Sequence, residues 1–377
     1  MVEGKVNPLK PKIVLLFVLL SVAMLLLMWT DPFLEKRFIH RSADRENEQP
    51  NLLMSLVNSY QNVTYIGDIV VENETYLVEN MELHLIGNIT ARNNATVIIR
   101  NSKLVLMIGA SHREAVELKD TSKFIAENAT IYFQSVSDDS SEITITDEAQ
   151  VNITESSLFG WTYLIGGRNS KVFIANSIAK GPEPNRLREF GIVTRDAANA
   201  RIENSTIDRV EAREQSSIYV TKSFVPSALL TEGGGIIEIE NSDVGSCLLS
   251  GNSNIRISNS TLENIDFGGA TLYVKDSSVN SSAWAYDNSK IWFQSTRVFH
   301  VHAYENSTVW LINSGARYID TSGDGKVYVG WQLPVFGIVV IPHTWILVFQ
   351  VVFYLAIAVI IIASSVLIVL RWKPRLI

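Results

Sequence analysis

A short internal repeat, roughly 18 residues long, is the feature that most restricts what this chain can fold into. Between residues 200 and 329, two apolar residues with one residue between them recur after short polar turns. The pairs are Ala200/Ile202, Ile218/Val220, Ile237/Ile239, Ile255/Ile257, Leu272/Val274, Ile291/Phe293, Val309/Leu311 and Val327/Val329. Consecutive hairpins would reverse the order of the faces, whereas an identical phase in every repeat favours strands stacked in one direction. The spacing therefore predicts a parallel β-helix.

Five apolar positions in each repeat predict the core. With the first apolar residue as position 0, positions 0, 2, 7, 10 and 12 are apolar in 33 of 35 cases over the seven repeats that start between residues 200 and 309. The exceptions are Ser282 and Thr321, and weaker copies start at Val97, Val116, Ile131, Val151 and Val172. Because a half-buried strand buries alternate residues, we expect an all-β fold. The predicted fold is a parallel β-helix solenoid of about 13 coils of ~18 residues.

Two uncharged apolar segments flank the repeats. Residues 13–29 and residues 345–370 contain no charged side chain, and both segments have lengths typical of transmembrane helices. Lysines precede the first segment and basic residues follow the second, and basic residues favour the cytoplasmic side. We therefore predict a plasma-membrane protein with one transmembrane helix at each end, two spans in all, and both termini in the cytoplasm. A cleaved signal peptide is the alternative for the first segment.

These features give the expected domain organisation. In chain order it is a cytoplasmic tail (1–12), a transmembrane signal anchor (13–30), a linker (31–60), the extracytoplasmic β-helix (61–333), a membrane-proximal linker (334–344), a transmembrane helix (345–370) and a cytoplasmic tail (371–377). Two polar stretches, 134–142 and 181–190, interrupt the repeat and are predicted to loop out of it.

Charge, cysteine content and sequons limit the function classes. The part expected outside the membrane carries a formal charge of −12, which argues against a nucleic-acid partner because such partners need a basic surface. Cys247 is the only cysteine, so the chain forms no internal disulfide and has no CxxC metal motif. Ten Asn-x-Ser/Thr sequons predict a glycoprotein, although Asn-Ser-Thr is also a common turn sequence. They start at Asn62, Asn73, Asn88, Asn94, Asn128, Asn152, Asn204, Asn259, Asn280 and Asn306.

The N-terminal repeats resemble a known family. The stretch GDIVVENETYLVENMELHLIGNITARNNATVIIRNSKLVL at 67–106, followed by repeats such as NSNIRISNSTLENI, resembles the right-handed parallel β-helix proteins of the pectin-lyase-like superfamily. It looks most like their membrane-anchored surface versions in archaea, over about residues 67–330. The family includes polysaccharide lyases, glycosidases, adhesins and envelope proteins. Its enzymes use clustered Asp, Lys and Arg on stacked outer strands, and no such row is found at position 1, so no catalytic residue is assigned.

A row of aromatic residues is the first candidate binding site. Tyr273, Trp292, Trp310 and Tyr328 all occupy position 1, the outward position between two inward ones, in four consecutive repeats. In a parallel stack they would form a ladder on the outer surface. Such a ladder could bind a sugar polymer or a partner protein, or could simply stabilise the sheet through ring contacts.

Residues near the end of the repeats form a candidate metal site. His300 and His302 flank an inward position, so both should face outward, and Asp320 should lie beside them on the next coil. Zinc or general-base chemistry would suit this group, and two solvated histidines are the alternative.

The sequence DTSGDG at 320–325 matches the first half of a calcium loop through Asp320 and Asp324, but Trp331 stands where an EF-hand has glutamate. A plain Asp/Gly turn is the alternative.

The function that fits these features best is a non-catalytic cell-surface or envelope protein. It would be tethered to the membrane at both ends and would bind a surface polysaccharide or a partner protein, with no cofactor. The alternative is a polysaccharide lyase or glycoside hydrolase of the same fold.

Overall fold

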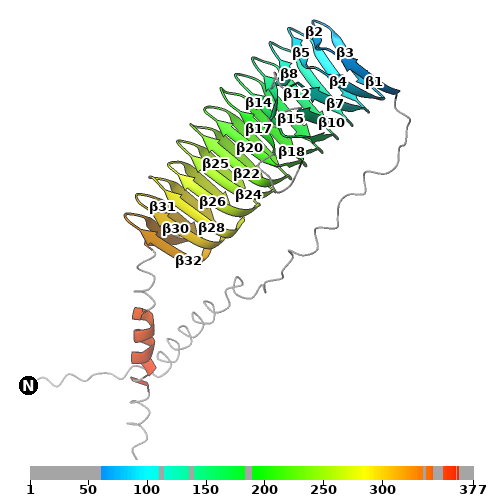
Figure 1. Cartoon of the computed structure of the whole chain (residues 1–377). Coiled ribbons are helices and arrows are strands. Elements are labelled where there is room, and N and C mark those ends of the chain that lie inside the picture. Colours follow the sequence, from blue (N-terminus) through cyan, green and yellow to red (C-terminus); the bar gives the residue numbers. More distant parts are fainter. Residues whose placement is uncertain are drawn as a thin grey trace, which may run out of the picture. The chain divides into compact units, whose positions relative to one another are not determined.

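The computed structural model describes residues 61–109, 114–135, 140–182, 189–333, 337–342, 351–361 and 363–364. By its contacts the chain divides into a unit of residues 1–59 and a unit of residues 60–377, and the described residues all belong to the second unit. Within them, 34 strands form a 14-stranded and a 20-stranded sheet that wind together into a solenoid (Figure 1). The all-β parallel solenoid predicted from the repeat is therefore confirmed.

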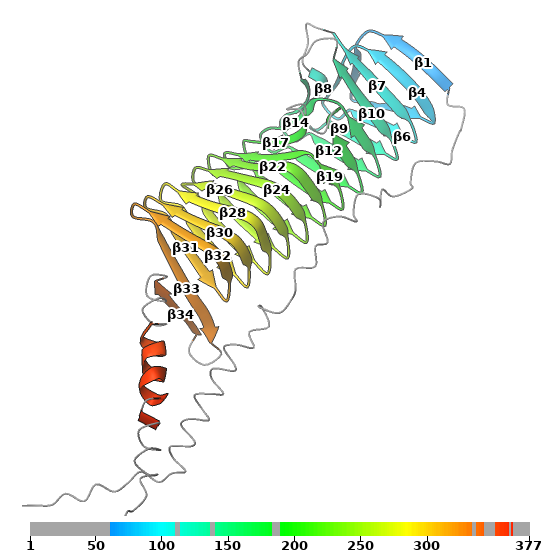
Figure 2. The ribbon, with the colours of Figure 1, turned by 60° about the horizontal axis from the view of Figure 1, so that its bottom comes forward.

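The 14-stranded sheet contains one strand from each coil. Its first 13 strands pair in parallel and in register, which gives about 13 coils, and the last strand pairs antiparallel with its neighbour (Figure 2). The strands are β3 (Thr75–Glu79), β6 (Thr96–Arg100), β9 (Lys123–Glu127), β12 (Gln150–Thr154), β15 (Lys171–Ala175), β18 (Asn199–Glu203), β21 (Ser217–Thr221), β23 (Ile236–Glu240), β25 (Asn254–Ser258), β27 (Thr271–Lys275), β29 (Lys290–Gln294), β31 (Thr308–Ile312), β33 (Lys326–Leu333) and β34 (Gly337–Pro342).

The 20-stranded sheet begins as two columns of strands. The first column is β1 (Gln61–Ile66), β4 (Met81–Ile86), β7 (Lys103–Ile108), β10 (Thr130–Ser135), β13 (Ser157–Phe159), β16 (Ile178–Lys180) and β19 (Thr206–Ile207). The second is β2 (Ile69–Glu72), β5 (Ile89–Arg92), β8 (Glu114–Leu118), β11 (Ser141–Ile145), β14 (Thr162–Gly166), β17 (Phe190–Thr194) and β20 (Arg209–Arg213). N-terminal coils therefore have three strands each.

The two columns merge into one column of long strands. In β22 (Phe224–Glu232), Phe224 pairs with Thr206 of β19, and Ala228 pairs with Arg209 of β20. The column continues as β24 (Asp243–Ser250), β26 (Thr261–Gly268), β28 (Ser278–Tyr286), β30 (Arg297–Tyr304) and β32 (Gly315–Ser322). The C-terminal coils therefore have two strands each, one short and one long.

Coils before this junction are longer than the predicted repeat. Along the 14-stranded sheet the register passes from Val97 to Phe124, Val151, Val172 and Ala200, and each of these steps is longer than any step between the later coils. The predicted repeat starts at Val116 and Ile131 lie instead in β8 and β10 of the other sheet. Each of the three strands in such a coil carries the apolar-x-apolar pattern. The pattern alone therefore does not show to which strand of the coil an apolar pair belongs.

Both predicted excursions leave the solenoid at the same corner of the coil. One lies between β10 and β11 and the other between β16 and β17, and their central residues fall outside the described residues. The carboxylate Oδ2 of Asp208 accepts hydrogen bonds from the backbone N–H groups of Gly181 (2.5 Å) and Phe190 (3.2 Å). One carboxylate thus ties together both ends of the second excursion.

An asparagine-rich corner leads each coil from the 14-stranded into the 20-stranded sheet. Twelve successive corner residues have φ between 45° and 54°, the left-handed region that Asn tolerates better than most residues. They are Asn80, Asn101, Asn128, Glu155, Asn176, Asn204, Lys222, Asn241, Asn259, Asp276, Ser295 and Asn313. A buried serine often follows: the backbone N–H of Ser205 donates to Ser223 Oγ (3.2 Å), whose hydroxyl donates to the carbonyl of Thr221 (2.7 Å). The recurring Asn-Ser pair is therefore the corner sequence of this fold.

The core follows most of the predicted positions. Ile255, Ile257, Leu262, Ile265 and Phe267, which occupy positions 0, 2, 7, 10 and 12 of one repeat, are all 0% exposed. Alternate side chains of each strand therefore form one continuous apolar core along the solenoid.

Two strands depart from this pattern because each contains a bulge. In β22 the register shifts between Val225 and Ala228, and Leu229 and Thr231 are buried in place of Ala228 and Leu230. In the second strand, β28, the register shifts between Val279 and Ser282, where two residues lie opposite one residue of β30.

The bulge in β28 changes which side chains face the core. Ala283 and Ala285 are buried in place of Ser282 and Trp284. Trp284 consequently faces outward, and the prediction that it belongs to the core is wrong.

Cys247 provides a chemical test of which residues face inward. It occupies position 10 of its repeat, is fully buried, and burial raises the pKa of its thiol to about 12. Because thiol reagents attack the thiolate, we expect no labelling of the native protein and complete labelling in denaturant. A time course with a thiol reagent that releases a coloured product measures both rates. Fast labelling of the native protein would place Cys247 on the outer face, since a slip by one residue exchanges the two faces.

The predicted pair of transmembrane helices requires correction. Residues 13–30 lie outside the described residues, and in the segment 345–370 the described continuous helix covers only 351–361. Among the described residues no helix combines the length and the apolar character needed to cross a membrane. The predicted fold class is therefore wrong in this part.

Candidate functional site

An acidic groove on the 20-stranded sheet is one candidate site of the described solenoid. Its volume is about 490 Å³, and it extends over β20, β22, β24, β26 and β28 to the turns after β28 and β30. Four steps between neighbouring strands at ~4.8 Å make it roughly 19 Å long. The lining residues are Glu211, Leu230, Thr231, Glu232, Leu248, Leu249, Ser250, Asp266, Gly268, Tyr286, Asp287 and Glu305. A groove of this length suits a stretch of polymer better than a small metabolite.

Carboxylates dominate the polar lining of the groove. Five lining residues are acidic, and none of the described residues that line it is basic. The buried carboxylate of Glu211 is balanced, because it accepts hydrogen bonds from Arg209 (3.1 Å) and Arg213 (2.5 Å). Arg213 also lies 3.7 Å from Glu232. The three remaining carboxylates leave the groove negative, so it should repel polyanions and attract hydroxyl or amine donors.

An array of nearly parallel rings borders the groove. Trp284 stacks on His302 with ring centroids 3.7 Å apart and planes 9° apart, and Tyr286 stacks on Tyr304 at 5.5 Å and 10°. Trp284 and Tyr286 lie on β28, while His302 and Tyr304 lie on β30. The array arises because the register shift in β28 turns Trp284 and Tyr286 outward, directly before His302 and Tyr304 of the next coil.

Small residues leave the outer faces of the tyrosine pair open. On the N-terminal side the neighbour of Tyr286 in register is Gly268, and the neighbour of Tyr304 on the C-terminal side is Ser322. Tyr286 thereby forms a wall of the acidic groove. Tyr304 forms a wall of a second cavity of about 340 Å³ that also includes Gly323. An open ring face beside hydrogen-bonding carboxylates is an arrangement that can hold a sugar ring.

Tyr286 lies in an environment that keeps its hydroxyl protonated. Its pKa is raised from the ordinary value, first by burial and then by the charges of Asp266 and Tyr304. Its hydroxyl therefore remains a hydrogen-bond donor as well as an acceptor at neutral pH.

The predicted aromatic row lies in register on the other sheet, where the rings of Trp292, Trp310 and Tyr328 stack on one another. Trp292 pairs with Trp310, with centroids 4.4 Å apart and planes 5° apart, and Tyr328 follows Trp310 at 6.1 Å. Tyr273 precedes Trp292 in the register. Because stacked rings cover each other's faces, the two tryptophans offer mainly edges to a ligand. The geometry favours stabilisation of the sheet over sugar stacking for this pair.

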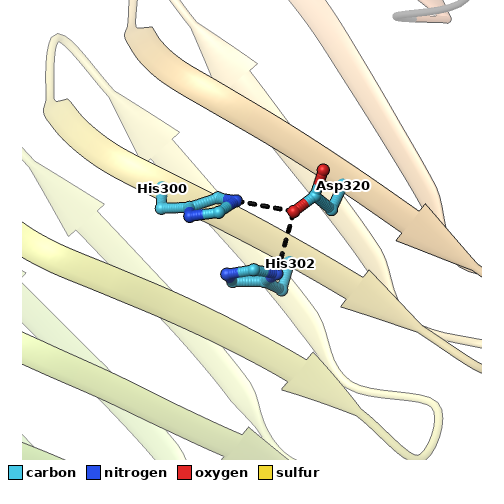
Figure 3. Close-up of side chains that lie close together, drawn as sticks. All are labelled: His300, His302 and Asp320. Atoms are coloured by element: carbon cyan, nitrogen blue, oxygen red, sulfur yellow. Dashed lines mark hydrogen bonds and ion pairs between the residues drawn. The ribbon is translucent and has the colours of Figure 1, made fainter.

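The predicted histidine site forms a close cluster (Figure 3). His300 Nε2 lies 2.7 Å and His302 Nδ1 lies 3.4 Å from Oδ2 of Asp320, and the two imidazole rings are 3.7 Å apart. His302 is 6% exposed, and its pKa is lowered by burial and by His300, against an opposing effect of Asp320. His302 is therefore neutral at pH 7 and able to act as a ligand or a base.

Asp324 does not join this cluster. It is exposed in the turn between β32 and β33, and the group of His and acidic side chains able to share a metal comprises His300, His302 and Asp320 within the described residues. Gly325 in the same turn has no room for a side chain, since an added Cβ would meet the Ala303 carbonyl oxygen at 2.2 Å. The turn therefore has a structural reason for its Asp/Gly sequence.

The sequon asparagines are mostly accessible. Asn88 and Asn152 are half-buried, and the other eight are exposed. Of these eight, Asn128, Asn204 and Asn259 also occupy the left-handed corner position described above. For these three, the turn function and a glycosylation site are compatible with the same sequence.

Sequence reasoning missed the ring array and the acidic groove. Its fixed template placed Trp284 inward, and it did not bring together the acidic residues that line the groove. A signal was available: the step from Leu272 to Ile291 is longer than the step on either side of it, and the bulge of β28 lies within that step.

The comparisons with known proteins identify no relative of this chain. No protein-family model, no curated protein and no solved structure matches this chain.

Proposed function

We propose that this chain is a non-catalytic surface β-solenoid protein that binds a neutral or amine-bearing polysaccharide in the acidic groove. The single observation that carries the proposal is the open face of Tyr286 beside the carboxylates of Asp266, Asp287 and Glu305. Carboxylates accept hydrogen bonds from hydroxyl and ammonium groups, and an aromatic face packs against the apolar face of a sugar ring. The same carboxylates disfavour acidic polymers such as polyuronates.

We also propose that the solenoid lies outside the cytoplasm. We propose further that the chain is related to the pectin-lyase-like superfamily, in particular to its archaeal surface type. The location is supported by eight exposed sequon asparagines along the solenoid. The kinship is supported by the repeat pattern and the parallel stacking of about 13 coils. Mass spectrometry of the protein isolated from its source tests the first part, because it detects glycans on these asparagines.

The second candidate function is a glycoside hydrolase, and several carboxylates on one groove favour it. Such enzymes need two carboxyl groups on either side of the scissile bond. A lyase acting on acidic polymers is less compatible, since the described lining has no basic side chain to hold an anionic substrate.

Replacing Tyr286 tests the groove directly. We expect Tyr286→Ala to weaken binding of a neutral or amine-bearing polysaccharide at least about tenfold, because the stacking surface is lost. Affinity electrophoresis of the full chain in gels containing a neutral glucan, chitosan or polygalacturonate measures the effect. The matched control is Tyr219→Ala, which removes a half-buried tyrosine from β21 of the other sheet, outside both candidate binding sites.

The outcomes separate the candidates. Retardation by the glucan or chitosan that is lost only in Tyr286→Ala supports the proposal. Retardation by polygalacturonate alone, or equal effects of both substitutions, contradicts it. Release of reducing ends by the unaltered protein in the same incubations would establish the hydrolase instead.

A further inference from the structure

A three-residue cluster of nitrogen and oxygen donors shares His302 with the ring array. His300 and His302 are two residues apart on β30, so both project from the same face, and Asp320 lies opposite His302 on β32. Their ligand atoms all lie within 4.8 Å of one another. Three side chains from two adjacent coils thus converge on one point of a rigid sheet.

We propose that His300, His302 and Asp320 bind a divalent transition-metal ion, with zinc as the ion that best fits the donor set. Two imidazole nitrogens and one carboxylate oxygen are donors that Zn²⁺ accepts. Calcium and magnesium prefer sites built from oxygen atoms alone. The inference is independent of the proposed polysaccharide groove, since none of the three side chains lines it.

The distances between donors fit a tetrahedral ion after a small movement. With metal–ligand distances near 2.0–2.1 Å, tetrahedral ligands lie about 3.3–3.4 Å apart. The His302 Nδ1 to Asp320 Oδ2 distance is already 3.4 Å. The His300 Nε2 to Asp320 Oδ2 distance of 2.7 Å must lengthen by roughly 0.6 Å. The Asp320 side chain is 59% exposed and can move by this amount.

Packing holds one imidazole in place before a metal arrives. Trp284 covers one face of His302 at 3.7 Å, and the Tyr304 ring lies parallel to it at 6.0 Å. The side chain of His302 is 8% exposed, whereas that of His300 is 25% exposed. A ligand fixed by its surroundings loses little conformational freedom on binding, which favours affinity.

The fourth coordination position faces solvent. Asp320 is exposed and His300 is half-buried, so a water molecule can complete the tetrahedron. Three protein ligands and a water ligand are the arrangement of zinc sites that keep one position open.

A histidine–glutamate pair elsewhere in the described solenoid supplies a matched control. His84 Nε2 lies 2.8 Å from Glu82 Oε1 on β4 of the same sheet, and Lys103 binds the same carboxylate oxygen at 2.8 Å. This pair has a His–carboxylate contact like that of His300 and Asp320, but a lysine occupies the place of the third ligand. It should not hold a metal ion.

The test is titration of the full chain with zinc alone after removal of bound metal by a chelator. We expect one Zn²⁺ per chain by isothermal titration calorimetry, and Co²⁺ in its place should give the visible absorption bands of four-coordinate cobalt. His300→Ala and Asp320→Asn should each weaken binding at least about 100-fold, because each removes one of three ligands. His84→Ala should leave stoichiometry and affinity unchanged.

Circular dichroism and thermal melting of the same samples confirm that the variants are folded. The two ligand substitutions are chosen because His300 and Asp320 are more exposed than His302, whose replacement could disturb the packing against Trp284. The proposal is overturned if the unaltered chain takes up no stoichiometric zinc. It is also overturned if both ligand variants retain the affinity, or if His84→Ala alone loses it.

Discussion

Phe267→Ala is expected to lower the free energy of unfolding of the solenoid by about 3–5 kcal/mol, the range measured when a buried aromatic residue is truncated. Phe267 is 0% exposed and is among the largest fully buried side chains. It lies at position 12 of its repeat and is paired in register with Leu249 and Ala285 of the neighbouring coils. Its removal leaves a cavity between coils that have no disulfide to hold them.

The matched control is Phe299→Ala. Phe299 lies on β30 of the same column but faces outward and is 38% exposed. It contacts the edge of Tyr318 and the guanidinium of Arg317, so its removal should cost about 1 kcal/mol or less. Urea unfolding followed by circular dichroism gives both values. Equal losses for the two phenylalanines would contradict the inward and outward assignment of these strands.

Hydrogen exchange adds a local measurement. In a solenoid each coil contacts mainly its neighbours, so a cavity in one coil weakens that coil and the adjacent ones most. We therefore expect loss of amide protection in β24, β26 and β28 before it appears in β3 or β6.

Much of this architecture could be predicted from sequence because the repeat encodes it locally. The repeat predicts that Ile255 and Phe267 are buried, because alternate residues of a strand share a face. Both are buried in the structure. The alignment of Trp292 with Trp310 followed from the length of the repeat alone, and the structure has this register. His300, His302 and Asp320 were brought together by the same reasoning, since residues one repeat apart lie side by side on neighbouring coils.

The parts that could not be predicted depend on features that a fixed period does not contain. In the N-terminal coils a third strand lengthens the repeat, so Val116 and Ile131 were assigned to the wrong sheet. In β28 one extra residue exchanges the two faces, which turned Trp284 from a predicted core residue into part of the ring array.

The acidic groove depends on position in three dimensions. Glu211 and Glu305 are separated by several coils in the sequence, yet both line the same cavity. The apolar segment 345–370 is predicted to be a transmembrane helix from its composition, whereas no helix among the described residues is long and apolar enough to cross a membrane.

The bulge in β22 leads to the second large expected effect. The register between β22 and β24 shifts between Val225 and Ala228, so that Pro226 and Ser227 together lie opposite the single residue Gly245. A Cβ atom added at Gly245 would lie 2.1 Å from the carbonyl oxygen of Pro226 and 3.0 Å from that of Ser227. Both obstacles are backbone atoms of the neighbouring coil, which cannot rotate away as a side chain can.

Gly245→Ala should therefore destabilise the solenoid by about 3 kcal/mol, because the strands must move apart to admit one methyl group. The control is Gly315→Ala on β32, where an added Cβ meets no atom within 4 Å. This second substitution should change the free energy of unfolding by less than about 1 kcal/mol, since it adds no contact and only restricts the unfolded chain. Urea unfolding of both variants decides the matter: a Gly245→Ala protein as stable as Gly315→Ala would mean that the carbonyl of Pro226 does not point at Gly245 and that the bulge lies elsewhere in the strand.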